Sequence, residues 1–210
     1  MAVVKLCGIK SEEDAALMNE VKPDYVGFVF APGKHQISAA SACRLSNIIR
    51  YSRLVGVFVN EQPAVIAKIA KQTGLDVIQL HGDESDADIR QLKESCNCEI
   101  WKALRIGQIE DMDAAAFPHA DRLLVDSYVQ GLRGGSGKRI AMDLLQKLDV
   151  SRLIIAGGIG MDTVEEILAL QPYGIDVSTA LETDGRKDKE KVRLFMKQIK
   201  EIRKAQECAL

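Results

Sequence analysis

The stretch LVGVFVNEQPAVIAKIAKQTGLDVIQLHG, residues 54–82, contains the pattern that decides the fold. A β-branched apolar run at 54–60 predicts a strand, and a second such run follows at 77–82. The segment between them, 63–74, has the amphipathic spacing of a helix and closes on Gly74. A strand, a helix and a strand in this order are typical of two parallel strands joined by a crossover helix.

The same alternation extends along the whole chain. It predicts strands at 3–7, 25–30, 54–60, 77–82, 99–106, 122–127, 152–158 and 174–180. It predicts helices at 11–21, 38–50, 63–74, 87–96, 142–148, 161–170 and 189–205, and the helical pattern is weakest around 109–117. Eight such units without a break in composition predict an α/β fold, a single parallel eight-stranded (β/α)8 TIM barrel over residues 1–210. An open doubly wound sheet is the alternative, although the first strand lacks the G-x-G-x-x-G of a nucleotide binder.

Composition limits the classes of partner. The chain has 210 residues, 28% of them charged, and a formal net charge of −2, so no basic field favours nucleic acid or a membrane surface. No apolar run reaches the roughly 20 residues of a membrane span, and no leader precedes the first strand, so we expect a cytoplasmic protein. The five cysteines show no C-x-x-C spacing, which predicts reduced thiols and no metal site.

Polar residues stand at the ends of the predicted strands. In a parallel barrel these ends meet on one face, where the chemistry lies. Each residue taken alone could simply cap the next helix, but their convergence on one rim favours a site. The residues are Cys7, Asn60, His81, Arg105, Asp126, Ser127, Ser178 and Thr179.

Two glycine-containing turns resemble a phosphate cradle. AGGIG at 156–160 follows the seventh strand and VSTALETDG at 177–185 follows the eighth, where such barrels usually hold phosphate. We expect the backbone N–H groups of Gly157, Gly158, Ala180 and Leu181 to bind the anion. A third cluster, GLRGGSGK at 131–138, contains Gly135 and is a mobile flap, part of this site or a solvated loop.

The ordered motifs KLCGIK, DYVGFVF, GVFVN, VIQLHGDE, LLVDS, GGSGK, IAGGI and GIDVSTALE resemble those of the phosphoribosylanthranilate isomerase family of tryptophan biosynthesis. The resemblance implies a cofactor-free Amadori rearrangement of N-(5-phosphoribosyl)anthranilate to 1-(2-carboxyphenylamino)-1-deoxyribulose 5-phosphate. It implies a general base at Cys7 and a general acid at Asp126. A phosphorylated small molecule is then the partner, and the chain is a monomer or homodimer. Binding residues are expected at Lys34, His35, His81, Gly135, Gly157, Gly158, Ser178, Thr179 and Ala180.

These two residue types suit the chemistry. A carboxylic acid can protonate the ring oxygen of a furanose if its pKa is raised by burial, and a base must then remove a proton from the second sugar carbon. A thiol with a pKa of about 8.5 is only about 3% ionised at neutral pH. We therefore expect Cys7 to be exposed at a glycine-rich cationic rim that lowers its pKa.

Three departures from the family pattern bear on substrate binding. His35 stands where the family has an arginine for the anthranilate carboxylate, beside Lys34. Ala180 replaces a glycine in the eighth-strand turn, and the usual aromatic residues after GGSGK are Ile140 and Met142. The alternative function is therefore a sugar-phosphate-binding barrel of the same family with an altered substrate or without activity.

Overall fold

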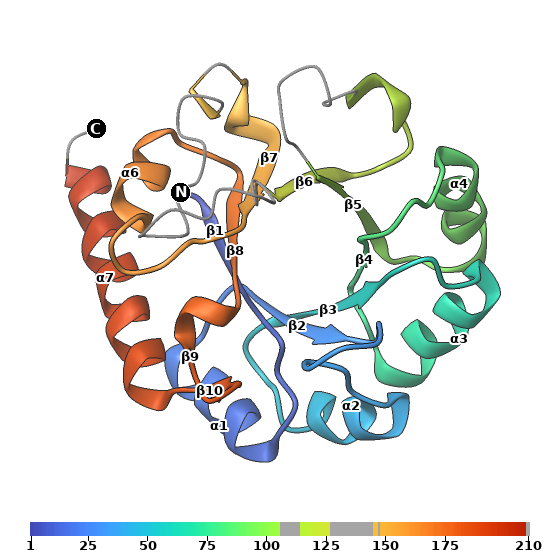
Figure 1. Cartoon of the computed structure of the whole chain (residues 1–210), viewed down its shortest axis with the longest axis horizontal. Helices are drawn as coiled ribbons and strands as arrows, with labels where there is room; N and C mark the ends of the chain where they lie inside the picture. Colours follow the sequence, from blue (N-terminus) through green and yellow to red (C-terminus); the bar gives the residue numbers. More distant parts are fainter. Residues whose placement is uncertain (106–113, 127–144, 147, 209–210) are drawn as a thin grey trace.

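Eight parallel strands form one closed ring in the order β1 to β8 (Figure 1). The computed structural model describes residues 1–105, 114–126, 145–146 and 148–208. The ring closes where β1 pairs with β8, so the barrel is confirmed and the open sheet is excluded. Its strands are β1 (Val3–Cys7), β2 (Tyr25–Val29), β3 (Arg53–Phe58), β4 (Val77–Leu80), β5 (Glu99–Arg105), β6 (Arg122–Asp126), β7 (Leu153–Ala156) and β8 (Gly174–Val177).

Helices lie on the outside of this ring (Figure 1). Ser11 and Ser85 each form a capping box with an aspartate three residues later, and such a cap stabilises a helix by about 1 kcal/mol. Gly74 ends its helix in the left-handed conformation, with φ 66°. The described helices are α1 (Glu12–Val21), α2 (Ala39–Ser46), α3 (Pro63–Thr73), α4 (Asp86–Ser95), α6 (Val164–Ala169) and α7 (Lys189–Cys208).

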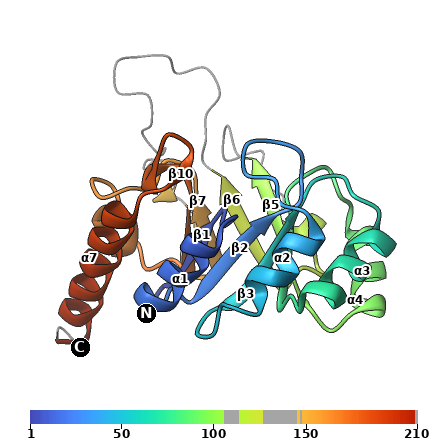
Figure 2. The ribbon, with the colours of Figure 1, turned by 90° about the horizontal axis from the view of Figure 1, so that it is seen from below.

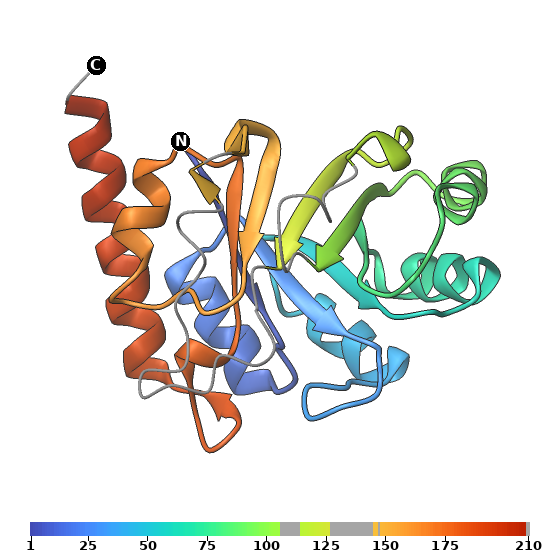
Figure 3. The same ribbon diagram turned by 45° about the horizontal axis from the view of Figure 1, so that its top comes forward.

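Two of the predicted helices are not established by the described residues. The weak pattern around 109–117 forms a 3-10 turn at Ala114–Ala116 in its described part. The pattern at 142–148 is described only at 145–146 and 148. The final helix, by contrast, is present and extends past the predicted end at 205 to Cys208. In Figures 1 and 3 it runs along the outer edge of the molecule beside α6 and α1, and its contacts with α1 show that the last helix of the chain packs beside the first.

Strand alternation divides the apolar side chains into two layers. One layer packs between the strands and the helices, where Leu6, Phe28 and Ile78 are completely buried. The other fills the interior of the ring and contains Trp101, which is also completely buried, and Tyr25, whose ring meets it edge-on at 4.9 Å. This inner layer fills the middle of the barrel, so the barrel interior is a packed core rather than a channel.

A short hairpin follows β8 and was not predicted from the sequence. A 3-10 turn at Thr179–Leu181 leads into β9 (Glu182–Thr183) and β10 (Arg186–Lys187), which pair antiparallel. Asp184 and Gly185 both have positive φ and form the tip between the two strands. Figure 2 shows the hairpin at the end of the barrel toward which the strands run. No helix in the described ranges is long and apolar enough to cross a membrane.

Candidate active site

A cavity of about 540 Å³ lies at the carboxyl ends of the strands. Strands from opposite parts of the sequence contribute to it, because ring closure brings all their ends together. Eight of the residues predicted from the sequence line this cavity: Cys7, His81, Asp126, Gly157, Gly158, Ser178, Thr179 and Ala180. Gly135, like Ile140 and Met142, lies outside the described residues.

Cys7 ends β1 with its thiol directly over the backbone of β2. The two strands pair Cys7 with Gly27, and a Cβ added at Gly27 would lie only 2.7 Å from the Cys7 Sγ. Real Cβ atoms essentially never approach another heavy atom this closely. The glycine at position 27 therefore provides the space that the thiol occupies.

The predicted exposure and pKa of Cys7 are wrong. The residue is buried, with 7% of its surface exposed, although it still lines the cavity. Burial raises the pKa of the Cys7 thiol above its usual value, while the neighbouring Lys5 ammonium lowers it in part. The thiol lies inside the barrel mouth rather than on a solvated rim, so the desolvation of a thiolate outweighs the favourable charge.

The sequence analysis missed a buried ion pair beside Cys7. The Lys5 Nζ donates to the Asp176 Oδ2 at 2.7 Å, and the two side chains are 1% and 10% exposed. Burial would lower the pKa of the Lys5 ammonium, but Asp176 and Cys7 raise it overall, so Lys5 is charged. The available signal was a lysine at an inward position in the otherwise apolar run VVKLC.

Asp126 ends β6 and faces His81 across a short gap. The His81 Nε2 and the Asp126 Oδ2 are 3.6 Å apart. The other ring nitrogen of His81 lies 3.0 Å from the side-chain nitrogen of Gln79, a buried residue that the sequence analysis also missed. Gln79 thus orients the imidazole so that its other nitrogen faces the Asp126 carboxyl group.

The two glycine-containing turns come together as expected. Gly157 and Gly158 both have positive φ, 87° and 64°, which favours glycine at these positions. A Cβ added at Gly160 would lie 3.4 Å from the Ala180 methyl group, so the turns after β7 and β8 are in close contact. Leu181 is one of the four residues whose backbone N–H groups were predicted to bind the anion. Its N–H instead donates to a carbonyl within its own turn.

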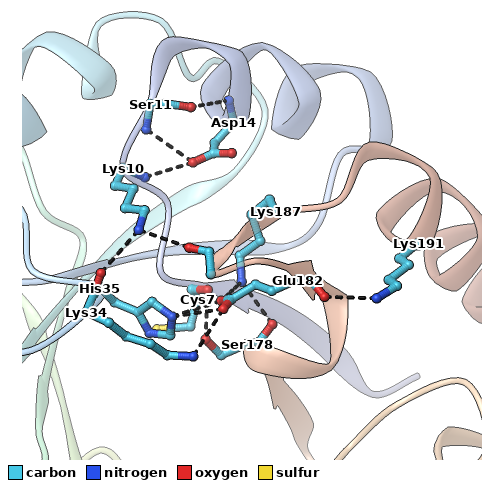
Figure 4. A network of polar contacts seen from close by, with 11 residues as sticks. Cys7, Lys10, Ser11, Asp14, Lys34, His35, Ser178, Glu182, Lys187 and Lys191 are labelled. Carbon is cyan, nitrogen blue, oxygen red and sulfur yellow. Dashed lines mark hydrogen bonds and ion pairs between the residues drawn. The ribbon is translucent and has the colours of Figure 1, made fainter.

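Lys34 and His35 contact a carboxylate of the chain itself. The His35 Nε2 lies 2.9 Å from Glu182, and the Lys34 Nζ lies 3.3 Å from the same carboxylate (Figure 4). The Lys187 Nζ also contacts this carboxylate, at 3.0 Å. Burial would raise the pKa of Glu182, but Lys187 and His35 lower it to about 2. Neither Lys34 nor His35 is among the residues that line the cavity.

Hydrogen bonds join this cluster to the strand ends at Cys7. The Lys187 Nζ donates to the Ser178 carbonyl at 2.9 Å, and the Ser178 hydroxyl donates to the Cys7 carbonyl at 3.2 Å. Figure 4 shows Glu182 between the hairpin cation on one side and His35 on the other. A Cβ added at Gly8 would lie 3.3 Å from the His35 ring, so the imidazole stands next to the residue that follows Cys7.

Comparison with known proteins points to one enzyme family. The sequence matches the family model described as N-(5'phosphoribosyl)anthranilate (PRA) isomerase over residues 4–198. A relative from Bacillus licheniformis named N-(5'-phosphoribosyl)anthranilate isomerase is 41% identical over 201 residues, which cover 91% of this chain and 92% of the relative.

Solved structures agree with this match. The crystal structure of phosphoribosyl anthranilate isomerase from Thermotoga maritima is similar, with a TM-score of 0.84 and 34% identity over 95% of this chain and 99% of the other. A second structure is of such an isomerase in complex with reduced 1-(o-carboxyphenylamino)-1-deoxyribulose 5-phosphate. It has a TM-score of 0.82 and 32% identity over 95% of this chain and 99% of the other.

Proposed function

This chain belongs to the N-(5'-phosphoribosyl)anthranilate isomerase family, and from this we propose that Cys7 and Asp126 perform its reaction as general base and general acid. The chain is an isomerase of tryptophan biosynthesis. The observation that carries the proposed mechanism is that both side chains line one cavity, with the glycine-containing turns after β7 and β8 at its edge.

Asp126 acts first in this proposal. It donates a proton to the ring oxygen of the furanose, the bond from that oxygen to the first sugar carbon breaks, and the anthranilate nitrogen supplies the electron pair that forms an iminium. The resulting Asp126 carboxylate faces His81, whose Nε2 lies 3.6 Å away. His81 therefore stands where a proton could be shared with the acid during the cycle.

Cys7 acts second. Its thiolate removes the hydrogen from the second sugar carbon, which the iminium has made acidic, and the electron pair of that bond forms an enol and neutralises the nitrogen. The enol then becomes the ketone of 1-(2-carboxyphenylamino)-1-deoxyribulose 5-phosphate when the first carbon takes up a proton and the enol hydroxyl group releases one to solvent. Gly27 supports this role, since it leaves the space beside the strand open for the sulfur.

We assign the substrate phosphate to the turns that contain Gly157, Gly158, Ser178, Thr179 and Ala180. The anthranilate carboxylate is assigned to the edge beside Lys34 and His35, where the cations outnumber the carboxylate of Glu182. No cofactor enters the proposed steps. In keeping with a biosynthetic role, we place the protein in the cytoplasm as a monomer or homodimer that acts on a free small molecule, with no nucleic acid or membrane partner.

A direct assay tests the proposed function. Freshly prepared N-(5'-phosphoribosyl)anthranilate is mixed with the protein, and the loss of its fluorescence is followed. We expect turnover with the unaltered chain and a rate at least about a hundred-fold lower with Asp126→Asn, the low end of the effect of a positioned acid. An inactive but folded wild-type protein would overturn the proposal.

A further inference from the structure

Lys5 and Cys7 share the inward face of β1. Side chains two residues apart in a strand point to the same side, and both lie over the same glycine of β2. A Cβ added at Gly27 would lie 2.7 Å from the Cys7 Sγ and 3.1 Å from the Lys5 Cε. The stem of the lysine and the thiol therefore stand side by side in the mouth of the barrel.

The charge on Lys5 is held by one oxygen of Asp176. The Lys5 Nζ lies 2.7 Å from the Asp176 Oδ2, while the Oδ1 of this carboxylate is buried and has no hydrogen-bond partner among the residues described. Asp176 also lines the cavity. The Lys5 stem lies beside the thiol, and the effect of the Lys5 charge on the thiol is larger than the opposing effect of Asp176. The field of this charge is screened little in a buried site.

Other charged groups face Cys7 from the surrounding elements. Lys187 approaches from the β9–β10 hairpin, with its ammonium bound to Glu182 and to the Ser178 carbonyl. His81 and Asp126 line the same cavity from β4 and β6. Both lysines are thus paired with a carboxylate. Of the two, Lys5 has the larger effect on the pKa of the Cys7 thiol.

We propose that Lys5 is a positioning residue for proton abstraction: its ammonium stabilises the thiolate of Cys7, and Asp176 sets how much of that charge the thiolate feels. This inference rests on the proposed role of Cys7 as the base. Lys5 keeps its proton throughout, and the hydrogen taken from the substrate becomes the thiol hydrogen. The lysine thus explains how a buried cysteine can serve as a base.

The electrostatics of the site agree with this division of roles. Lys5 lowers the pKa of the Cys7 thiol and Asp176 raises it, and both effects are smaller than that of burial. The two members of one ion pair should therefore act on the thiol in opposite directions.

The test is a titration of the Cys7 thiolate by its ultraviolet absorbance, which does not depend on activity. It uses a chain in which the other four cysteines are replaced by serine, with Cys7→Ser in the same background as the blank. We expect Lys5→Met to raise the titration midpoint by at least about one pH unit, and Asp176→Asn to lower it. The double variant, which leaves no unpaired buried charge, should lie above the unaltered chain and below Lys5→Met.

Activity supplies the second readout. Near neutral pH, each pH unit by which the midpoint rises should lower kcat about tenfold, because the thiolate fraction falls tenfold. KM should change less than kcat. Midpoints that shift in the same direction in both single variants, or do not move in folded proteins, would overturn the inference. If the midpoints of the two single variants shift in opposite directions but the unaltered chain shows no turnover, the proposed function is contradicted and the inference about Lys5 is not.

Discussion

The imidazole of His35 lies 2.9 Å from the carboxylate of Glu182, an interaction between two residues 147 positions apart in the chain. It ties the segment after β2 to the hairpin after β8. His35, which we expect from the sequence to stand at the family's arginine position, is therefore held by a partner that a substrate carboxylate would have to share. This relationship makes both residues useful for testing how the substrate carboxylate is bound.

Replacing His35 by arginine should improve substrate binding. A guanidinium stays charged at every working pH and can bind two carboxylates at once, whereas an imidazole is charged only when it is protonated. We expect His35→Arg to lower KM and to flatten its rise with pH. The gain in substrate binding free energy should be at most about 1.5–3 kcal/mol, the contribution of one charge-assisted hydrogen bond. KM measured at several pH values checks this, with His35→Gln as the uncharged control. An unchanged or higher KM in a folded variant would place the carboxylate elsewhere.

Removing the charge of Glu182 should lower stability at neutral pH and weaken its dependence on pH in the acid range. The pKa of this carboxyl group is lowered to about 2 in the folded protein, below the value near 4.3 of an unfolded chain. Its contribution is therefore present above about pH 4.3 and is lost as the pH falls toward 2. We expect Glu182→Gln to lower the free energy of unfolding at neutral pH by about 1–2 kcal/mol, after allowance for solvent screening, and to reduce its pH dependence in this window. Urea unfolding at several pH values measures both effects, and an unaltered pH dependence would contradict the assignment.

The proposed acid and base should each be required for turnover. Cys7→Ser replaces the thiol by a much weaker acid, and Asp126→Asn removes the proton that the acid donates. We expect each change to lower kcat by at least about a hundred-fold while the affinity for a product analogue stays nearly the same. Steady-state kinetics and calorimetric titration with reduced product separate the two quantities. Near wild-type turnover by Cys7→Ser would show that the base is another residue.

His81 should act through Asp126. Its Nε2 faces the carboxyl group at 3.6 Å, and Gln79 orients the ring from the other side. We expect His81→Phe, which keeps a ring of similar size, to lower kcat about tenfold and to shift its pH profile, with little change in KM. The matched control is Gln79→Leu, which should give a smaller loss because the imidazole remains. A rise in KM with unchanged kcat would make His81 a binding residue instead.

A branched side chain at Gly158 should impair phosphate binding. The residue has φ 64° and lines the cavity, so a β-branched valine is strained there and occupies space that the anion needs. We expect Gly158→Val to raise KM about tenfold or more and to weaken inhibition by inorganic phosphate. Gly33→Ala is a control for glycine replacement at positive φ, since nothing lies within 4 Å of a Cβ there. Equal inhibition by phosphate in Gly158→Val and the unaltered chain would contradict the assignment of the phosphate to these turns.

The sequence alone determined the barrel and the location of the site. Apolar alternation is a local property, so runs such as VVKLC and RLLVDS identified their strands, and the polar residues that end them identified one rim. Besides Cys7, seven residues expected at this rim line the cavity: His81, Asp126, Gly157, Gly158, Ser178, Thr179 and Ala180. These predictions needed only the strand period and the rule that parallel strand ends meet.

Tertiary structure alone decided the environment of those residues. The burial of Cys7 depends on Gly27 in the next strand, and the Lys5–Asp176 pair joins residues 171 positions apart that meet only where β1 closes the ring against β8. Glu182 likewise reaches His35 only because the hairpin after β8 folds next to the segment after β2. Desolvation and ion pairing depend on which groups approach through space, and no local pattern in the chain encodes those distances.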